Sequence, residues 1–232
     1  MRTALASCLL LALAFVATLW MTMGFRAFTA EQGRRLHVAA EQPRVPRVRL
    51  VDAAGNVHAL RDWVRADGRD WIVTFFYTRC QSLCGVLGSR YQRIQDALKR
   101  RGLADEVALL SISFDPKHDD VPTLAAYARR MDTDPDIWRV ARVADPAELQ
   151  KLLRFFGVAV IPNELGGFLH NAALLWVEEN ARLTRIVDLD ELWTDSMLSD
   201  YLAAATPASA ARGRNQLRRL PVPARPQLAH VR

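Results

Sequence analysis

The sequence predicts an α/β domain, and three observations lead to this class. Apolar, β-branched and aromatic runs, such as residues 71–77 and 107–114, are typical of strands that are buried on both faces. Segments with apolar residues at spacings of three and four follow these runs, which predicts amphipathic helices. Later, two strand-like runs are joined by a short polar turn. Together these patterns indicate a central mixed sheet flanked by helices.

The individual elements follow in a regular order. A small hairpin is expected first, at residues 49–51 and 57–60, around the turn at residues 52–56. Asp145 is the expected N-cap of a later helix, with Pro146 at its first position. The elements expected after the hairpin are strand 71–77, helix 84–101, strand 107–114, helix 121–131, strand 137–143, helix 146–156, strands 171–177 and 182–187, and helix 189–205. This order is that of a thioredoxin-like fold.

Length and charge limit the classes of function. The chain has 232 residues, half of them hydrophobic, which is enough for one domain of about 150 residues with extensions. The net charge is +6, but six arginines and no acidic residue follow Thr206, so 25 basic and 25 acidic residues remain before it. Because the body is neutral, nucleic-acid binding is not favoured.

The chain is expected to divide into four parts. Residues 1–26 form an N-terminal membrane anchor, because Thr3 to Phe25 carries no charge over a length that spans a bilayer. No small-x-small cleavage site follows closely, which favours an uncleaved segment. Residues 27–45 form a polar linker, residues 46–205 the thioredoxin-like domain, and residues 206–232 a disordered basic tail rich in proline and arginine. His37 in the linker is expected to be solvated.

Two of the three cysteines carry the strongest chemical signal. Cys8 lies in the apolar N-terminal run, so Cys80 and Cys84 are the pair available within the domain. They lie where a strand leads into a helix, and unpaired N–H groups at a helix start favour thiolates. A spacing of four residues on a first turn separates their Cβ atoms by roughly 5–6 Å. This geometry suits one soft metal ion or one disulfide, and His170 is the candidate third ligand.

Three blocks of sequence together resemble a known family. The stretches YTRCQSLC, SISFDPKHDD and GGFLHNAALLWVEENARL are similar in order and spacing to those of the Sco/SenC family of membrane-anchored, thioredoxin-fold copper chaperones. The resemblance runs from about Pro46 to Leu202. It implies a copper site, for Cu(I) or Cu(II), formed by Cys80, Cys84 and His170. Many members carry proline after each cysteine, whereas this chain has Gln81 and Gly85.

The resemblance also implies a location and a partner. It predicts a single-pass protein of the inner membrane whose C-terminal domain faces the periplasm and delivers copper to the copper-site subunit of cytochrome c oxidase or to another copper protein. The charges near the N-terminal segment predict the opposite orientation, because Arg26, Arg34 and Arg35 follow it and only Arg2 precedes it. Large domains can cross a membrane regardless of this count, so the periplasmic location is retained.

Two functions stay open from the residues alone. The first is a metallochaperone that needs both cysteines and His170. The second is a thiol-disulfide oxidoreductase in which Cys80 and Cys84 exchange with the copper-site cysteines of the oxidase or with another client, and which does not need His170. Whether the protein is an enzyme is therefore left open. Asp115 and Asp119 match the Asp-Pro block of the family, near the metal turn, and Asp115 is expected to cap a turn or helix.

Overall fold

The computed structural model describes residues 2–22, 29–80, 83–163 and 167–188. The helices are α1 (Arg2–Met21), α2 (Ala30–Glu41), α3 (Leu60–Asp67), α4 (Leu83–Arg101), α5 (Val121–Arg130) and α6 (Pro146–Phe156). The strands are β1 (Arg49–Asp52), β2 (Val57–Ala59), β3 (Asp70–Phe76), β4 (Val107–Ser113), β5 (Trp138–Val143), β6 (Val160–Pro162), β7 (Phe168–His170), β8 (Ala173–Val177) and β9 (Leu183–Asp188).

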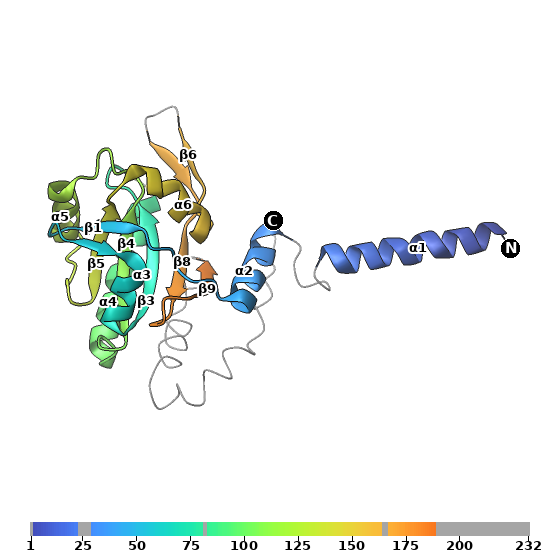
Figure 1. The fold of residues 1–232 in the computed structure, drawn as a ribbon, viewed down its shortest axis with the longest axis horizontal. Helices are drawn as coiled ribbons and strands as arrows, with labels where there is room; N and C mark the ends of the chain where they lie inside the picture. Colours follow the sequence, from blue (N-terminus) through green and yellow to red (C-terminus); the bar gives the residue numbers. More distant parts are fainter. Residues whose placement is uncertain (1, 23–28, 81–82, 164–166, 189–232) are drawn as a thin grey trace, which may run out of the picture.

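A seven-stranded mixed sheet forms the centre of the domain, which confirms the predicted α/β class (Figure 1). Its strand order is β2-β1-β5-β4-β3-β8-β9. The three central strands, β3, β4 and β5, are parallel, whereas β1, β8 and β9 pair antiparallel to their neighbours. Strands β3 and β4 pair in register from Asp70 and Val107 to Phe76 and Ser113. Their carboxyl ends therefore meet at one edge, which is where α/β sheets place their sites.

Buried side chains pack on both faces of this sheet. A cluster between α4 and the sheet consists of Ile72, Tyr91, Ile94, Ala97, Leu98, Leu103, Val107, Leu109, Ile137, Trp138, Leu174 and Val187. On the other face, the ring of Phe156 from α6 lies 5.4 Å from that of Phe75 on β3. Tyr91 of α4 donates a hydrogen bond from its buried hydroxyl to the Ile72 carbonyl, at 3.0 Å. These contacts hold α4 and α6 against opposite faces of the sheet whose edge carries the site.

The polar linker predicted at residues 27–45 contains the helix α2. Thr29 and Gln32 form a reciprocal capping box at its start. Arg34 donates a 2.9 Å hydrogen bond to the carbonyl of Phe156, at the carboxyl end of α6. Val38 is its buried apolar residue and packs into the main core. The segment folds because a cap and one arginine compensate for a face with few apolar residues.

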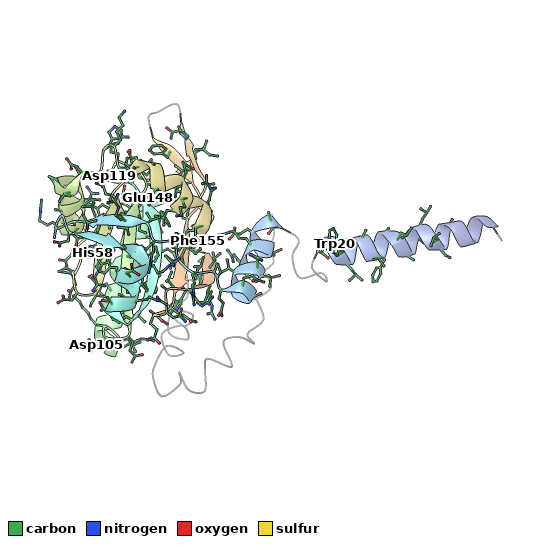
Figure 2. All side chains as sticks on the ribbon, in the orientation of Figure 1. Trp20, His58, Asp105, Asp119, Glu148 and Phe155 are labelled. Carbon is green, nitrogen blue, oxygen red and sulfur yellow. The ribbon has the colours of Figure 1, made fainter. Side chains whose placement is uncertain are left out.

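The N-terminal segment forms a helix whose described apolar side chains face outward. Leu11 is 71% exposed and Trp20 is 84% exposed (Figure 2). Within the ranges that the structure describes, no helix combines the length and the apolar character needed to cross a membrane. The membrane-spanning anchor expected at residues 1–26 is therefore not borne out there.

Most other predicted elements are confirmed within one or two residues. The helix 146–156 has the predicted bounds, and Asp145 caps it by accepting a hydrogen bond from the Ala147 N–H. The helix α3 and the two-stranded β6–β7 hairpin were not predicted. Figure 1 shows this hairpin extending beyond the end of the main sheet. The predicted helix 189–205 and the basic tail 206–232 lie outside the described residues.

Candidate metal centre

The first half of the candidate site is the connection from β3 to α4. Tyr77 follows the strand and is buried. The N–H of Cys80 donates to the carbonyl of Tyr77 at 3.3 Å, which closes a turn, and Cys80 is half-buried against the main core. Cys84 is the second residue of α4. The two cysteines therefore lie where β3 leads into α4, as predicted. Cys80, however, precedes the start of α4 at Leu83, so the pair does not share the first helical turn on which the expected Cβ spacing was based.

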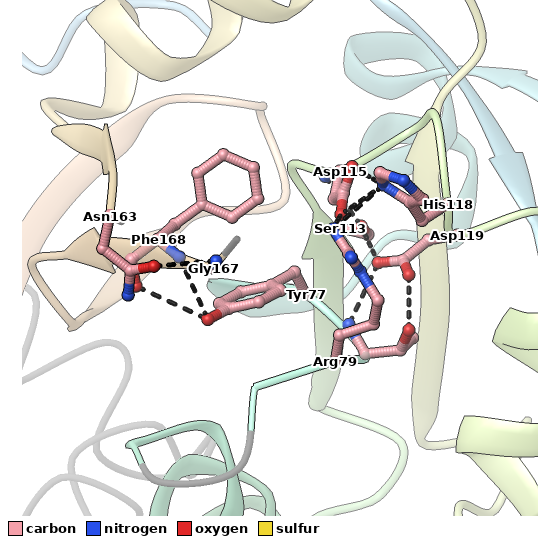
Figure 3. Close-up of polar contacts among 10 residues, drawn as sticks. Tyr77, Arg79, Ser113, Asp115, His118, Asp119, Asn163, Gly167 and Phe168 are labelled. Atoms are coloured by element: carbon pink, nitrogen blue, oxygen red, sulfur yellow. Dashed lines mark hydrogen bonds and ion pairs between the residues drawn. The ribbon is translucent and has the colours of Figure 1, made fainter. Parts of the chain in front are cut away.

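Thr78, two residues before Cys80, is held by a buried carboxylate. Asp119 is fully buried and accepts a 3.1 Å hydrogen bond from the backbone N–H of Thr78 (Figure 3). The hydroxyl of Thr78 donates to the other oxygen of the same carboxylate, and the hydroxyl of Ser113 donates to the first. Asp119 therefore joins the end of β4 to Thr78, within the turn that Tyr77 and Cys80 close.

Arg79, directly before Cys80, is held by a second carboxylate. Its Nη2 lies 2.9 Å from Oδ2 of Asp115, whose side chain is 5% exposed. Nδ1 of His118 also lies 2.9 Å from both oxygens of Asp115. The backbone carbonyl of Asp115 accepts the N–H groups of His118 and Asp119 and closes a turn at residues 115–119, while its side chain contacts Arg79 and His118. The helix cap of α5 is the next acid, Asp120.

The second half of the candidate site is the β6–β7 hairpin, which carries His170 at its end. Asn163 and Gly167 close it with a backbone hydrogen bond of 2.9 Å and a side-chain hydrogen bond of 2.8 Å. The hydroxyl of Tyr77 accepts the N–H of Phe168 at 3.2 Å and donates to its carbonyl at 3.5 Å (Figure 3). Tyr77, three positions before Cys80, is therefore hydrogen-bonded to Phe168, two positions before His170.

The imidazole of His170 lies in an aromatic setting. Its ring centre is 5.0 Å from that of Phe114 and 6.3 Å from that of Tyr77. Burial lowers the pKa of His170, opposed by a hydrogen bond with the carbonyl of Asn171. Because that carbonyl can only accept, the 3.0 Å bond assigns the hydrogen to Nδ1. The neutral ring then presents Nε2 as a lone-pair donor, the form in which histidine binds metals.

The predicted ligands are brought together only in part. Cys80 and His170 belong to segments that are both fixed on Tyr77, whereas the side chain of Cys84 lies outside the described residues. Among the described side chains, no group of three or more His, Cys, Asp or Glu residues is placed to hold a metal ion. The ligand set of Cys80, Cys84 and His170 therefore stays a prediction. His37 is exposed on α2 and His118 pairs with Asp115.

Sequence reasoning missed the residues that connect the two halves. Tyr77, Phe114 and Phe168 form mutual ring contacts with centre distances of 5.2–5.6 Å. Tyr77 was assigned only to the end of a buried strand, and Phe168 to the approach to His170. The sequence offered one signal, the tyrosine at the end of a buried strand. A buried hydroxyl requires a hydrogen-bond partner, so a contact of Tyr77 with another segment could have been expected.

Solved structures share this fold. A SCO1/SenC family lipoprotein from Bacillus anthracis has a TM-score of 0.59 and 20% identity, over 68% of this chain and 89% of its own. Copper-bound ScoI from Bradyrhizobium japonicum has a TM-score of 0.56 and 20% identity, over 68% and 97%. BsSco, described as having a disulfide switch and as a member of the Sco family of cytochrome c oxidase assembly proteins, has a TM-score of 0.57 and 21% identity, over 71% and 94%.

Identities this low show the fold alone, and the family follows from a separate comparison. The SCO1/SenC family model matches residues 40–204, which is more than half of the chain. The match includes the turn with Cys80, the Asp115 and Asp119 segment and the hairpin with His170. The chain therefore belongs to the SCO1/SenC family.

Proposed function

We propose that this protein is a metallochaperone that binds copper through Cys80, Cys84 and His170 and delivers it during the assembly of cytochrome c oxidase. One observation carries the proposal. The hairpin that ends in His170 is hydrogen-bonded to Tyr77, in the strand end that leads directly to Cys80, at the carboxyl edge of the central parallel strands. The fold thus connects a soft-ligand turn to a neutral imidazole.

The donor set fits copper as cargo. Two thiolates and one imidazole nitrogen are soft or borderline ligands, which select Cu(I) over hard cations. Helix starts favour the thiolate form of a cysteine in their first turn, and Cys84 is the second residue of α4. Nε2 of His170 is in the form that can bind without first losing a proton. A site with three protein ligands leaves room for a client ligand to enter, so the metal can leave by ligand exchange.

The relatives support this direction. ScoI of Bradyrhizobium japonicum was solved with copper bound, and BsSco is described as belonging to a family of cytochrome c oxidase assembly proteins. By family membership we extend both properties to this chain. The client we propose is the copper-site subunit of the oxidase.

An anaerobic Cu(I) competition titration of the full-length reduced protein tests the proposal. We expect one tightly bound equivalent, abolished by Cys80→Ser or Cys84→Ser and weakened at least tenfold by His170→Ala, or about 1.4 kcal/mol. His37→Ala is the matched control, because His37 is an exposed histidine on α2. Full affinity in either cysteine variant would overturn the proposed site.

The second candidate is a thiol-disulfide oxidoreductase that uses the same cysteines. The disulfide switch described for BsSco favours it. In this reaction a thiolate of the pair attacks a client disulfide, and the second cysteine displaces the reduced client as the pair becomes a disulfide. The two functions separate at His170. If thiol-disulfide exchange is the main activity, His170→Ala should leave the reduction of a model disulfide unchanged. If copper delivery is the main activity, the same substitution should lower the affinity for copper.

We also propose that the protein associates with the inner membrane and works on its periplasmic side. The exposed apolar side chains of α1 support association, since such surfaces mark contacts with lipid or protein. The related Bacillus anthracis protein is described as a lipoprotein. Fractionation after a carbonate wash should leave the protein in the membrane pellet, and added protease should digest the domain in spheroplasts. Recovery in the soluble fraction would contradict this location.

A further inference from the structure

Tyr77 touches both halves of the candidate site, and its hydroxyl makes the connection. The hydroxyl accepts the N–H of Phe168 and donates to the carbonyl of the same residue, at 3.2 and 3.5 Å. The carbonyl of Tyr77, at the other end of the residue, accepts the N–H of Cys80. One residue therefore bonds to the cysteine turn through its backbone and to the histidine hairpin through its side chain.

The hairpin is not paired with the main sheet among the described strands. It pairs only within itself, as a two-stranded sheet of three residues a strand, and does not extend the seven-stranded sheet among the described strands. Short two-stranded sheets are marginally stable without further packing. Tyr77 and Phe114 share that packing: the ring of Tyr77 lies 5.2 Å from Phe168 and 6.3 Å from His170, and that of Phe114 lies 5.6 Å and 5.0 Å from the same two residues. Tyr77 adds to this packing the two hydrogen bonds of its hydroxyl to the backbone of Phe168. The ring and the hydroxyl act at adjacent points of the hairpin.

A glycine in the hairpin leaves space for this hydroxyl. A Cβ atom added at Gly167 would lie 2.9 Å from the hydroxyl oxygen of Tyr77. The glycine therefore permits the close approach that brings the hydroxyl to the backbone of Phe168. Asn163 holds the same glycine from the opposite strand through its Oδ1, at 2.8 Å. The Tyr77 hydroxyl therefore packs against Gly167 and is hydrogen-bonded to the backbone of Phe168.

We propose that Tyr77 is a positioning residue that sets His170 at the correct place relative to Cys80. It acts through the β6–β7 hairpin and makes no contact with the metal. Without the hydroxyl, the hairpin opens more often, and the imidazole spends less time where it can complete the site. This inference rests on the proposed copper site, but its structural half can be measured without copper.

The test compares Tyr77→Phe with a matched variant, Tyr91→Phe. Both remove one hydroxyl that bonds to a backbone carbonyl and retain the ring, and Tyr91 lies within α4 against Ile72, away from the hairpin. Amide hydrogen exchange of Phe168 is measured by NMR in the full-length apoprotein. We expect Tyr77→Phe to accelerate this exchange at least tenfold and Tyr91→Phe to leave it unchanged. Unchanged exchange in Tyr77→Phe would overturn the proposal.

A double-mutant cycle then tests whether Tyr77 acts through His170. Tyr77→Phe alone should weaken Cu(I) binding by about tenfold, or about 1.4 kcal/mol. In a His170→Ala background the same substitution should change the affinity less than twofold, because the ligand that it positions is gone. An equal loss in both backgrounds would overturn the proposal. If the parent protein binds no copper, the proposed function fails, and the exchange measurement alone decides whether Tyr77 holds the hairpin.

Discussion

Replacing Asp119 with alanine should destabilise the protein more than any other single acidic substitution near the site. The carboxylate is fully buried and accepts three hydrogen bonds, from the N–H and hydroxyl of Thr78 and from the hydroxyl of Ser113. A hydrogen bond to a charged group contributes about 1.5–3 kcal/mol, and such contributions are not additive within one network. We therefore expect Asp119→Ala to lower the free energy of unfolding by about 3–5 kcal/mol.

Urea unfolding followed by tryptophan fluorescence measures this loss. With a slope of about 2 kcal/mol per molar, the midpoint should fall by roughly 2 M. Asp119→Asn retains one acceptor oxygen and should lose less, about 1–3 kcal/mol. Asp105→Ala is the control, because Asp105 is an exposed acid whose removal should change stability by about 0.5 kcal/mol or less. A midpoint for Asp119→Ala within error of that control would refute the assigned role.

Two further predictions concern the body of the domain. Burial raises the pKa of Asp70 to about 6, with Glu178 and Glu179 adding to the rise against hydrogen bonds from Glu179 and Trp176. The folded state then holds this proton more tightly than the unfolded state. As the pH rises from about 4 to about 6, the free energy of unfolding should therefore fall by up to about 3 kcal/mol. Asp70→Asn should flatten this slope in urea titrations, and an identical slope in both proteins would contradict the assignment. Arg34→Ala should cost about 1 kcal/mol and speed limited proteolysis within α2, since Arg34 bonds to the Phe156 carbonyl and pairs with Glu31. Unchanged cleavage would show that another contact holds α2.

Local patterns predicted the sheet and its main helices. The apolar run of β3 and the helical spacing of α4 are strong and uninterrupted, and both are confirmed within two residues. The helix α6 was located by its Asp145 cap and Pro146. The helix α2 was missed because its apolar content is low, although its capping box was legible in Thr29 and Gln32. The apolar periodicity of α2 is too weak to predict a helix, and the helix is stabilised by its cap and by the hydrogen bond from Arg34 to the Phe156 carbonyl.

The sequence names the candidate ligands, whereas the residues that support them could not be predicted from it. Cys80 and Cys84 stand out by residue type and spacing, His170 is selected mainly by the resemblance to the family, and the family match covers all three. Their supports depend on long-range contacts: Tyr77 meets Phe168 across 91 positions, and Thr78 meets Asp119 across 41. Local patterns carry no information on such pairings. The β6–β7 hairpin was missed for a different reason, because strands of three residues are too short to show an alternating pattern.

X-ray absorption spectroscopy of the Cu(I)-loaded full-length protein tests the central claim most directly. The account predicts two sulfur scatterers and one nitrogen scatterer around copper, with one sulfur lost in Cys80→Ser and the nitrogen lost in His170→Ala. This ligand set would establish the site that connects the β3–α4 turn to the β6–β7 hairpin. Coordination by nitrogen and oxygen alone, or a sulfur count that does not change in Cys80→Ser, would contradict it.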